Sequence, residues 1–288
     1  MSGRAVGERA FIGLQYLLPQ RLLSWIVGLV AESRIGFVRA GLIRAFLGRY
    51  PVNLAEAAEP DPARYASFND FFTRRLRAGA RSFDPDPRAA LCPADGTVSQ
   101  AGHIAGDTLL QAKGIDYSAS ALLGGDAATA AEFAGGEFAT IYLAPHNYHR
   151  VHMPLAGTLR LARFVPGDLF SVNAATSASL PGLFARNERI ACVFDTAAGP
   201  LAVVLVGALF VGSMSLAWAG RIRPEGPRRA RELPSHDPLI ALDRGAELGS
   251  FNMGSTVVVM FAPQGPALVA GIAAGRAVRF GERLAMPR

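Results

Sequence analysis

The sequence contains a serine, histidines and an aspartate of the kind that together can perform nucleophilic chemistry. Ser255 follows Gly254 and opens an apolar run. Three of the five histidines fall within seven residues, and His149 and His152 are two of them. Asp95 lies in a Pro-Ala-Asp-Gly turn. A serine hydroxyl attacks well only when a base takes its proton, and a carboxylate can orient a histidine for that task.

Each of these residues also has a simpler interpretation. Gly-Ser-Thr at 254–256 suits an ordinary turn before a strand, and Asp95 suits a turn aspartate. A histidine cluster can bind metal, but no cysteine pair or Glu-x-x-His helix accompanies this one, so we predict no metal site. A serine hydrolase built on Ser255, His152 and Asp95 is a further alternative, although the sequence has no Gly-x-Ser-x-Gly elbow.

The elements that position these residues follow from apolar spacing. Segments of strand length, rich in Val, Ile, Leu and Phe and punctuated by Gly, lie at 96–101, 138–143, 157–164, 189–195, 201–208, 211–216 and 256–261. Helices do not alternate with them, which argues against a parallel doubly wound sheet. We predict an α+β fold, in which N-terminal membrane-associating helices (1–82) precede a mainly antiparallel β sandwich or barrel (83–288).

The N-terminal region predicts helices with an unusual apolar content. Apolar residues recur at helical spacing over 22–30 and 37–47, Pro19 marks a helix boundary, and Ser67 is a suitable N-cap with Asp70 three residues on. Two interpretations remain open, a helical bundle packed on the main domain or amphipathic helices lying in a membrane interface. In the second, arginines lie at headgroup level: Arg21, Arg34, Arg39, Arg44 and Arg49.

Composition favours contact with an anionic membrane. Half of the residues are apolar and only 18% are charged, yet the net charge is +6. Lys and Arg near an anionic bilayer each contribute about 1 kcal/mol of attraction. The arginines are scattered and no nucleic-acid-reading motif is present, so we predict no nucleic-acid partner. Pro19 and Arg21 interrupt the most apolar N-terminal stretch, which argues against a spanning helix and favours a peripheral protein on the cytoplasmic side of the cell membrane.

A series of short motifs resembles one family, the phosphatidylserine decarboxylases of the longer bacterial and mitochondrial type. The motifs occur in the family's order: FNDFF (68–72), PADG (93–96), KG (113–114), YHRVHMP (148–154), SVN (171–173), LFARNER (183–189), VGA (206–208), VGS (211–213) and GST (254–256). One departure is Met253, where the family usually has Leu before Gly-Ser-Thr. Met has a similar volume and apolarity, so we expect little effect.

The resemblance implies that the chain cleaves itself. Ser255 would attack the Gly254 carbonyl with His152 as base, while Asp95 would hold the His152 ring and stabilise its imidazolium. The ester would eliminate to dehydroalanine, and hydrolysis would leave a pyruvoyl group, the covalent cofactor, at the new N-terminus of residue 255. The products, 1–254 and 255–288, would stay associated.

The resemblance also implies the reaction. The pyruvoyl group would form a Schiff base with phosphatidylserine and accept the charge left by carbon dioxide, giving phosphatidylethanolamine. His149 is the expected general acid. The processed unit is expected to form a homodimer and to open toward the lipid surface.

Two other functions are weighed against this one. A pyruvoyl enzyme could act on a small soluble amino acid such as aspartate or histidine, although such a substrate gives no reason for the apolar N-terminal region. A non-catalytic membrane-associated β domain would keep Ser255 uncleaved. The state of the chain after purification separates the second from the first.

Overall fold

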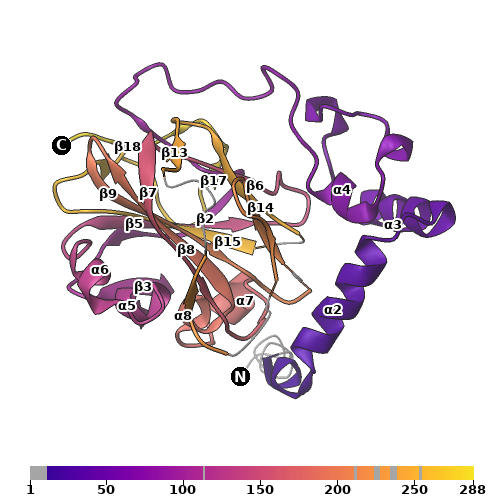
Figure 1. The fold of residues 1–288 in the computed structure, drawn as a ribbon, viewed down its shortest axis with the longest axis horizontal. Helices are drawn as coiled ribbons and strands as arrows, with labels where there is room; N and C mark the ends of the chain where they lie inside the picture. Colours follow the sequence, from indigo (N-terminus) through magenta and orange to yellow (C-terminus); the bar gives the residue numbers. More distant parts are fainter. Residues whose placement is uncertain (1–11, 113, 211–212, 224–227, 234–238, 253–254) are drawn as a thin grey trace.

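The computed structural model describes the chain except for residues 1–11, 113, 211–212, 224–227, 234–238 and 253–254. Its helices, besides a helical turn at 12–17, are α2 (Gln20–Ala31), α3 (Gly36–Arg49), α4 (Phe68–Phe72), α5 (Ala119–Leu122), α6 (Ala127–Ala131), α7 (Ala174–Ser177) and α8 (Leu183–Arg186), with 3-10 turns at Leu54–Glu56 and Pro62–Arg64. α2, α3 and α4 lie together on one side of the strands, and α5 and α6 lie on the other (Figure 1).

The strands form one large antiparallel sheet and smaller ones. The large sheet has the order β12 (Arg231–Glu232), β7 (Gly157–Val165), β8 (Arg189–Thr196), β9 (Gly199–Val206), β15 (Ser255–Phe261), β5 (Glu137–Leu143), β2 (Gly96–His103) and β17 (Ala277–Val278), with β13 (Ala241–Leu242) also on β7. A second sheet has the order β11 (Gly220–Ile222), β10 (Met214–Leu216), β14 (Glu247–Phe251) and β6 (Arg150–His152). The others pair β3 (Thr108–Ala112) with β4 (Ile115–Ser118), and β1 (Ala90–Leu91) and β16 (Ala267–Leu268) with β18 (Arg283–Met286).

The α+β and mainly antiparallel parts of the fold prediction are confirmed. All seven predicted strand segments contain strands, although 211–212 lie outside the described residues. Within the described part of the chain the large sheet is open, from β12 at one edge to β17 at the other, so the closed-barrel alternative is wrong. The sandwich alternative stays a prediction.

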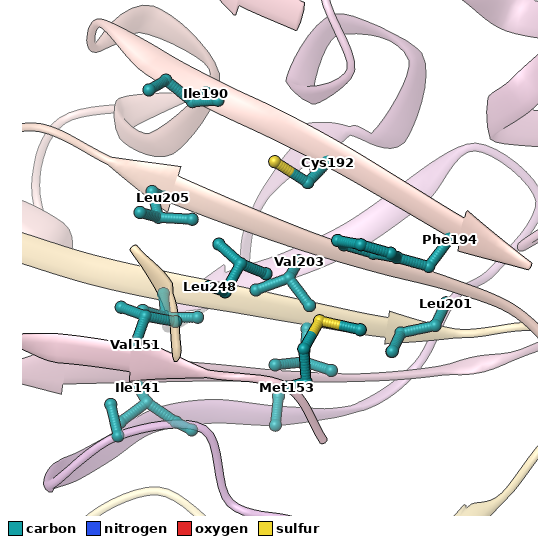
Figure 2. Close-up of a cluster of buried hydrophobic side chains, with 14 of the residues drawn as sticks. Ile141, Val151, Met153, Ile190, Cys192, Phe194, Leu201, Val203, Leu205 and Leu248 are labelled. Atoms are coloured by element: carbon teal, nitrogen blue, oxygen red, sulfur yellow. The ribbon is translucent and has the colours of Figure 1, made fainter. Parts of the chain in front are cut away.

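A large part of the hydrophobic core lies between the large sheet and the β6–β14 pair. Figure 2 shows the alternate side chains of β8 and β9 pointing toward side chains from β6, β14 and their flanks. The labelled members are Ile141, Val151, Met153, Ile190, Cys192, Phe194, Leu201, Val203, Leu205 and Leu248, and all of them are fully buried. Burying each large side chain contributes about 1.5–3 kcal/mol. This packing holds β6 and β14 against the large sheet.

The predicted helices are present, and the Ser67 cap is confirmed. The Ser67 hydroxyl accepts the backbone N–H of Asp70 at 3.0 Å, and the Asp70 carboxylate accepts that of Ala66 at 2.9 Å. Among the described residues, no helix combines the length and the apolarity needed to cross a membrane.

Candidate active site

The predicted cleavage point follows β14, which is hydrogen-bonded to the segment that carries the histidines. Phe251, the last residue of β14, donates its N–H to the carbonyl of His149 at 3.0 Å. Ser255 opens β15 and pairs with Leu143, the last residue of β5. Gly254 lies outside the described residues, and only the backbone of Ser255 is described. The described flanks therefore attach this part of the chain to both ends of the 144–149 loop.

His152 is held in a defined orientation by three neighbours. Its Nδ1 lies 2.9 Å from the carbonyl oxygen of Gly245, and its Nε2 lies 2.9 Å from the Tyr148 hydroxyl. The ring of Phe280 stacks on the imidazole with centroids 3.7 Å apart. Because a carbonyl oxygen only accepts, Nδ1 carries the hydrogen, and the Nε2 lone pair accepts from Tyr148. His152 thus presents its basic nitrogen in the neutral tautomer.

Asp95 lies beside His152 but does not hold its ring. The Asp95 carboxylate accepts both arms of the Arg81 guanidinium and the backbone N–H of Phe280, the latter at 2.9 Å. Both nitrogens of His152 have other partners, so Gly245 and Phe280 do the orienting that we expected of Asp95. Burial lowers the pKa of His152 to about 4, and the charge of Asp95 opposes a part of that shift. Phe280 contacts both residues.

His149 is completely buried and stays neutral. Its Nε2 donates to the carbonyl of Pro145 at 3.1 Å, and its ring stacks on Phe72 with centroids 4.0 Å apart. The Nδ1 atom is buried without a partner among the described residues. Burial, reinforced by the positive charge of Arg74, lowers the pKa of His149 to about 3. The ring can therefore accept a hydrogen bond at Nδ1, whereas the general-acid role predicted for it requires that it first take up a proton.

The Phe68–Phe72 motif forms α4, which contacts both the histidine loop and the segment before residue 254. Asn69, on α4, donates to the Asn252 side chain at 3.3 Å, and Asn252 donates to the hydroxyl of Ser213 at 2.8 Å. Phe72 covers His149, and the Arg74 guanidinium binds the carbonyls of residues 146 and 147 at 3.0 and 3.1 Å. α4 therefore braces both the histidine loop and the chain that leads to residue 254.

A cavity of about 390 Å³ begins at this brace and runs to α2. Its polar lining is Arg21, Ser24, Glu32, Asn69, Glu188, Ser213, Arg221, Arg223 and Asn252, and its apolar lining includes Trp25, Leu29 and Leu169. Arg21, which we expected at headgroup level, donates to the Gly167 carbonyl at 3.0 Å and lines this cavity, and its place at the headgroup stays a prediction. The lining thus combines three arginines with apolar side chains, and one of these arginines, Arg221, is ion-paired with Glu32.

Sequence reasoning did not find several residues of the site. Arg81 and Phe280 contact the predicted residues, yet neither stands in a pattern that marks it. Asn252 and Glu188 lie in or next to quoted motifs, but only the fold shows that both line one cavity. Asn252 and Glu188 could be linked to Ser255 only by knowing how the strands pair, which sequence spacing does not give.

Because His149 and His152 are buried and neutral, we expect the free energy of unfolding to decrease in mild acid. Burial lowers the pKa of His152 to about 4 and that of His149 to about 3, below the usual value near 6.5. The unfolded chain therefore binds protons first, so the stability that these rings contribute is full above pH 6.5 and falls as pH decreases toward 4, by up to about 1.4 kcal/mol per pH unit for each ring. Burial raises the pKa of Glu188 from 4.5 to about 7, which gives the opposite slope between those values and offsets about one ring's share. Urea unfolding of the Ser255→Ala chain between pH 7.5 and 5 measures this slope.

Replacing either histidine by Gln provides the control for that slope. His149→Gln and His152→Gln are each expected to flatten the pH dependence, because one titrating ring is removed. A midpoint for Ser255→Ala that is constant from pH 7.5 to 5 would contradict the buried, neutral rings.

Comparison with known proteins agrees with the geometry. The profile of the family described as phosphatidylserine decarboxylase matches residues 68–286, and one described as PSD matches residues 10–51. The phosphatidylserine decarboxylase proenzyme of Pseudomonas entomophila (strain L48) is 53% identical over 97% of this chain and 98% of its own length. That of Pseudomonas aeruginosa (strain LESB58) is 51% identical over 98% of each chain. The chain therefore belongs to the phosphatidylserine decarboxylase family.

Proposed function

We propose that this protein is a carboxy-lyase that cleaves itself at Gly254–Ser255 and then decarboxylates phosphatidylserine to phosphatidylethanolamine. The observation that carries the proposal is the attachment of the chain around residue 254 to the loop that bears His149, beside a cavity with a cationic lining. The names of the relatives, which are proenzymes, support the cleavage step.

In the cleavage step, the Ser255 hydroxyl attacks the Gly254 carbonyl. The neutral His152 takes the hydroxyl proton at Nε2, after exchanging its hydrogen bond with Tyr148 for one with Ser255. The Gly245 carbonyl keeps Nδ1 protonated and then stabilises the imidazolium, as does the nearby charge of Asp95. The C–N bond between residues 254 and 255 breaks as the ester forms, elimination of the Gly254 carboxylate leaves dehydroalanine at residue 255, and its hydrolysis by water releases ammonia and leaves the pyruvoyl group.

The surroundings of residue 255 fit such a group. His149 is wholly buried beside this segment and has a free Nδ1. A pyruvoyl carbonyl supplies an electron sink for the charge that remains when carbon dioxide leaves. The protein's own contribution is a dry pocket: Phe72 and Phe280 cover the two imidazoles and exclude water from them.

The cavity fits the phosphatidylserine headgroup. The phosphate and the carboxylate of that headgroup are anions, and Arg21, Arg221 and Arg223 line the cavity. Guanidinium groups bind both anions with charge-assisted hydrogen bonds. Trp25 and Leu29 line the same cavity and give it an apolar rim where acyl chains can leave. A small free amino acid would leave that rim without a partner.

The experiment that tests this function measures carbon dioxide released from carboxyl-labelled phosphatidylserine, with phosphatidylethanolamine as the second product. Aspartate and histidine, labelled in the same way, test the soluble-substrate alternative. An active-site phosphonate tests the hydrolase alternative. Release from either amino acid and not from the lipid would overturn the proposal, as would covalent reaction of an uncleaved chain with the phosphonate.

We extend the proposal to a peripheral location on the cytoplasmic side of the cell membrane, because α2 has its polar face toward the protein. Ser24 is buried and its hydroxyl accepts the N–H of Phe210 at 3.1 Å, and Gln20 accepts that of Leu169 at 2.8 Å. The opposite face is apolar and exposed, with Trp25 60% accessible. The exposed apolar side chains of this region are Leu14, Tyr16, Leu17, Leu22, Trp25, Ile26, Leu29, Val30, Ile35 and Phe37. A helix with this orientation suits a lipid interface.

Removing two of these side chains is expected to release the protein from lipid. Each large apolar side chain contributes about 1.5–3 kcal/mol when buried, so the double variant Trp25→Ser/Leu29→Ser should bind anionic vesicles at least about tenfold more weakly. Cosedimentation with phosphatidylserine-containing vesicles measures the change. Leu110→Ser, which removes an exposed apolar residue from β3, is the control. Equal vesicle binding by the double variant and the wild type would contradict an interfacial α2.

Association of the two processed chains is supported by their shared sheet. β15, which follows the cleavage point, lies between β5 and β9 in its centre, so separation would break both ladders. A homodimer of the processed unit rests on the family resemblance alone, and light scattering on the cleaved protein tests it.

A further inference from the structure

Glu188 is a buried carboxylic acid that neither the fold nor the proposed cleavage uses. Its side chain is 2% exposed, and Oε2 has no hydrogen-bond partner among the described residues. Its neighbours differ: Asn187 bonds the backbone of Phe170 and Gly207 through its side chain, and Arg189 bonds the carbonyls of residues 121, 122 and 187. Those two side chains support the fold, whereas that of Glu188 lines the cavity.

Strand register places Glu188 close to the reactive position. Arg189 of β8 pairs with Val206 of β9, and Val206 pairs with Thr256 of β15. The N–H of Gly207, which follows Val206, donates to the Glu188 carbonyl at 2.8 Å, and Ser255 precedes Thr256, so Glu188 and Ser255 lie at the same end of these three strands. Neighbouring strands are about 4.8 Å apart, so the backbones of Arg189 and Thr256, on either side of β9, are about 10 Å apart.

Gly207, the residue that follows β9, carries no side chain. A Cβ added at Gly207 would lie 3.1 Å from the Glu188 carbonyl oxygen and 3.6 Å from Leu169, so only glycine leaves this strand open. Asn252 and Ser213, which hold the chain before residue 255, line the same cavity as Glu188.

The charges around Glu188 allow it to exchange a proton near neutral pH. Burial raises the pKa of its carboxyl to about 7, against the opposing attraction of Arg21 from α2 and Arg231 from β12. His149 and His152, with pKa values of about 3 and 4, are neutral at rest in that range. Among these groups, the Glu188 carboxyl has the pKa best matched to proton transfer at pH 7.

We infer that Glu188 binds the ammonium group of the aminophospholipid headgroup and takes its proton, so that the amine can attack the carbonyl at residue 255. In this step an N–H bond of the ammonium breaks and an O–H bond forms on Glu188. The positive charge of the nitrogen and the negative charge of the carboxylate are both removed. The freed nitrogen lone pair is the pair that forms the bond to carbon. Arg21 and Arg223 line the same cavity and can bind the anionic groups of this headgroup, whereas Arg221 is ion-paired with Glu32. This inference rests on the proposed function.

Glu188→Gln tests the inference, because it keeps the shape of the side chain and removes its basicity. The variant should cleave itself completely, yet its kcat/KM for dihexanoyl phosphatidylserine at pH 7 should fall about 10²-fold. The deficit should shrink as pH rises through the pKa of the lipid amine, because solvent then removes the proton. Glu232→Gln makes the same charge change at an exposed residue of β12 and should match the wild type.

A second readout follows bond formation without turnover. Dihexanoyl phosphatidylethanolamine and cyanoborohydride should add the lipid mass to fragment 255–288 of the wild type, and the rate should be about 10²-fold lower in Glu188→Gln at pH 7. Glu188→Asp, which keeps a carboxyl group, should recover part of the rate and the wild-type pH response. It also carries the test if the Gln variant does not fold.

The outcomes separate this inference from the proposed function. A cleaved Glu188→Gln protein whose trapping rate and kcat/KM equal those of the wild type would overturn the role of Glu188 alone. So would a deficit that stays constant as pH rises through the amine pKa, since a merely structural defect gives that result. A wild-type chain that neither splits nor releases carbon dioxide would overturn the proposed function, whatever the variants do.

Discussion

Ser255→Ala is expected to yield a folded, uncleaved chain without decarboxylase activity. The variant has no hydroxyl to attack the Gly254 carbonyl, so no pyruvoyl group forms and no electron sink is available for the carbanion. We expect carbon dioxide release to fall to background, a loss of at least about 10⁶-fold, the lower end of enzymatic rate enhancements. A denaturing gel and a carbon dioxide assay on the same preparation measure both effects.

The backbone pairing of residue 255 makes this variant informative. Ser255 opens the central strand β15 through a main-chain pairing with Leu143, which alanine preserves. Ser250→Ala, at a buried serine of the neighbouring strand β14, is the matched control and should split fully. Activity in an uncleaved Ser255→Ala protein would show that the chemistry does not depend on this residue.

His152→Gln should slow self-cleavage by about 10²- to 10⁴-fold, the usual effect of losing a general base. Because burial lowers the pKa of His152 to about 4, its ring is neutral throughout the physiological range. The wild-type cleavage rate should therefore be constant between pH 8 and 6 and fall only as pH decreases toward 4. Glu247, Arg150 and Asp95 are the charged groups that act on this ring. Timed gels after refolding from denaturant give both results.

Two variants of neighbouring residues test how the His152 ring is positioned. Tyr148→Phe removes the hydroxyl that occupies Nε2 and leaves the ring, so cleavage should stay within about tenfold of wild type. Asp95→Asn removes the carboxylate charge and weakens the contacts with Arg81 and with the backbone of Phe280. Because Asp95 makes no hydrogen bond to the imidazole, this variant should slow cleavage less than His152→Gln does. A cleavage rate that falls through pH 6.5, as for an ordinary surface histidine, would contradict a buried neutral base.

Local patterns predicted the strands and helices because each element carries its own signal. Residues 201–206 are continuously apolar and become a central strand, and Ser67 caps α4 as its spacing to Asp70 predicted. Short strands such as β6 and β14 were missed because 150–152 and 247–251 lack a clear periodicity. They become strands by pairing with each other across the chain, which is a property of the tertiary fold.

Sequence patterns predicted which residues form the candidate site, and their roles stay predictions, whereas the hydrogen bonds among them were not predictable. His149, His152 and Asp95 lie near the end of β15, but the expected contact between Asp95 and His152 is replaced by Gly245, Tyr148 and Phe280. A backbone carbonyl such as that of Gly245 has no residue signature, so sequence reasoning assigns its role to a nearby carboxylate. The position of Glu188 near residue 255 followed only from the pairing of β8 with β9 and of β9 with β15.

The most direct test of the account is the intact mass of the wild-type protein after folding. We expect two species, residues 1–254 and residues 255–288. The second should be lighter by one ammonia than a fragment that begins with serine, and it should resist N-terminal sequencing. A single mass for residues 1–288 in a protein that decarboxylates phosphatidylserine would contradict the account, because the reaction would then proceed without a group made from Ser255.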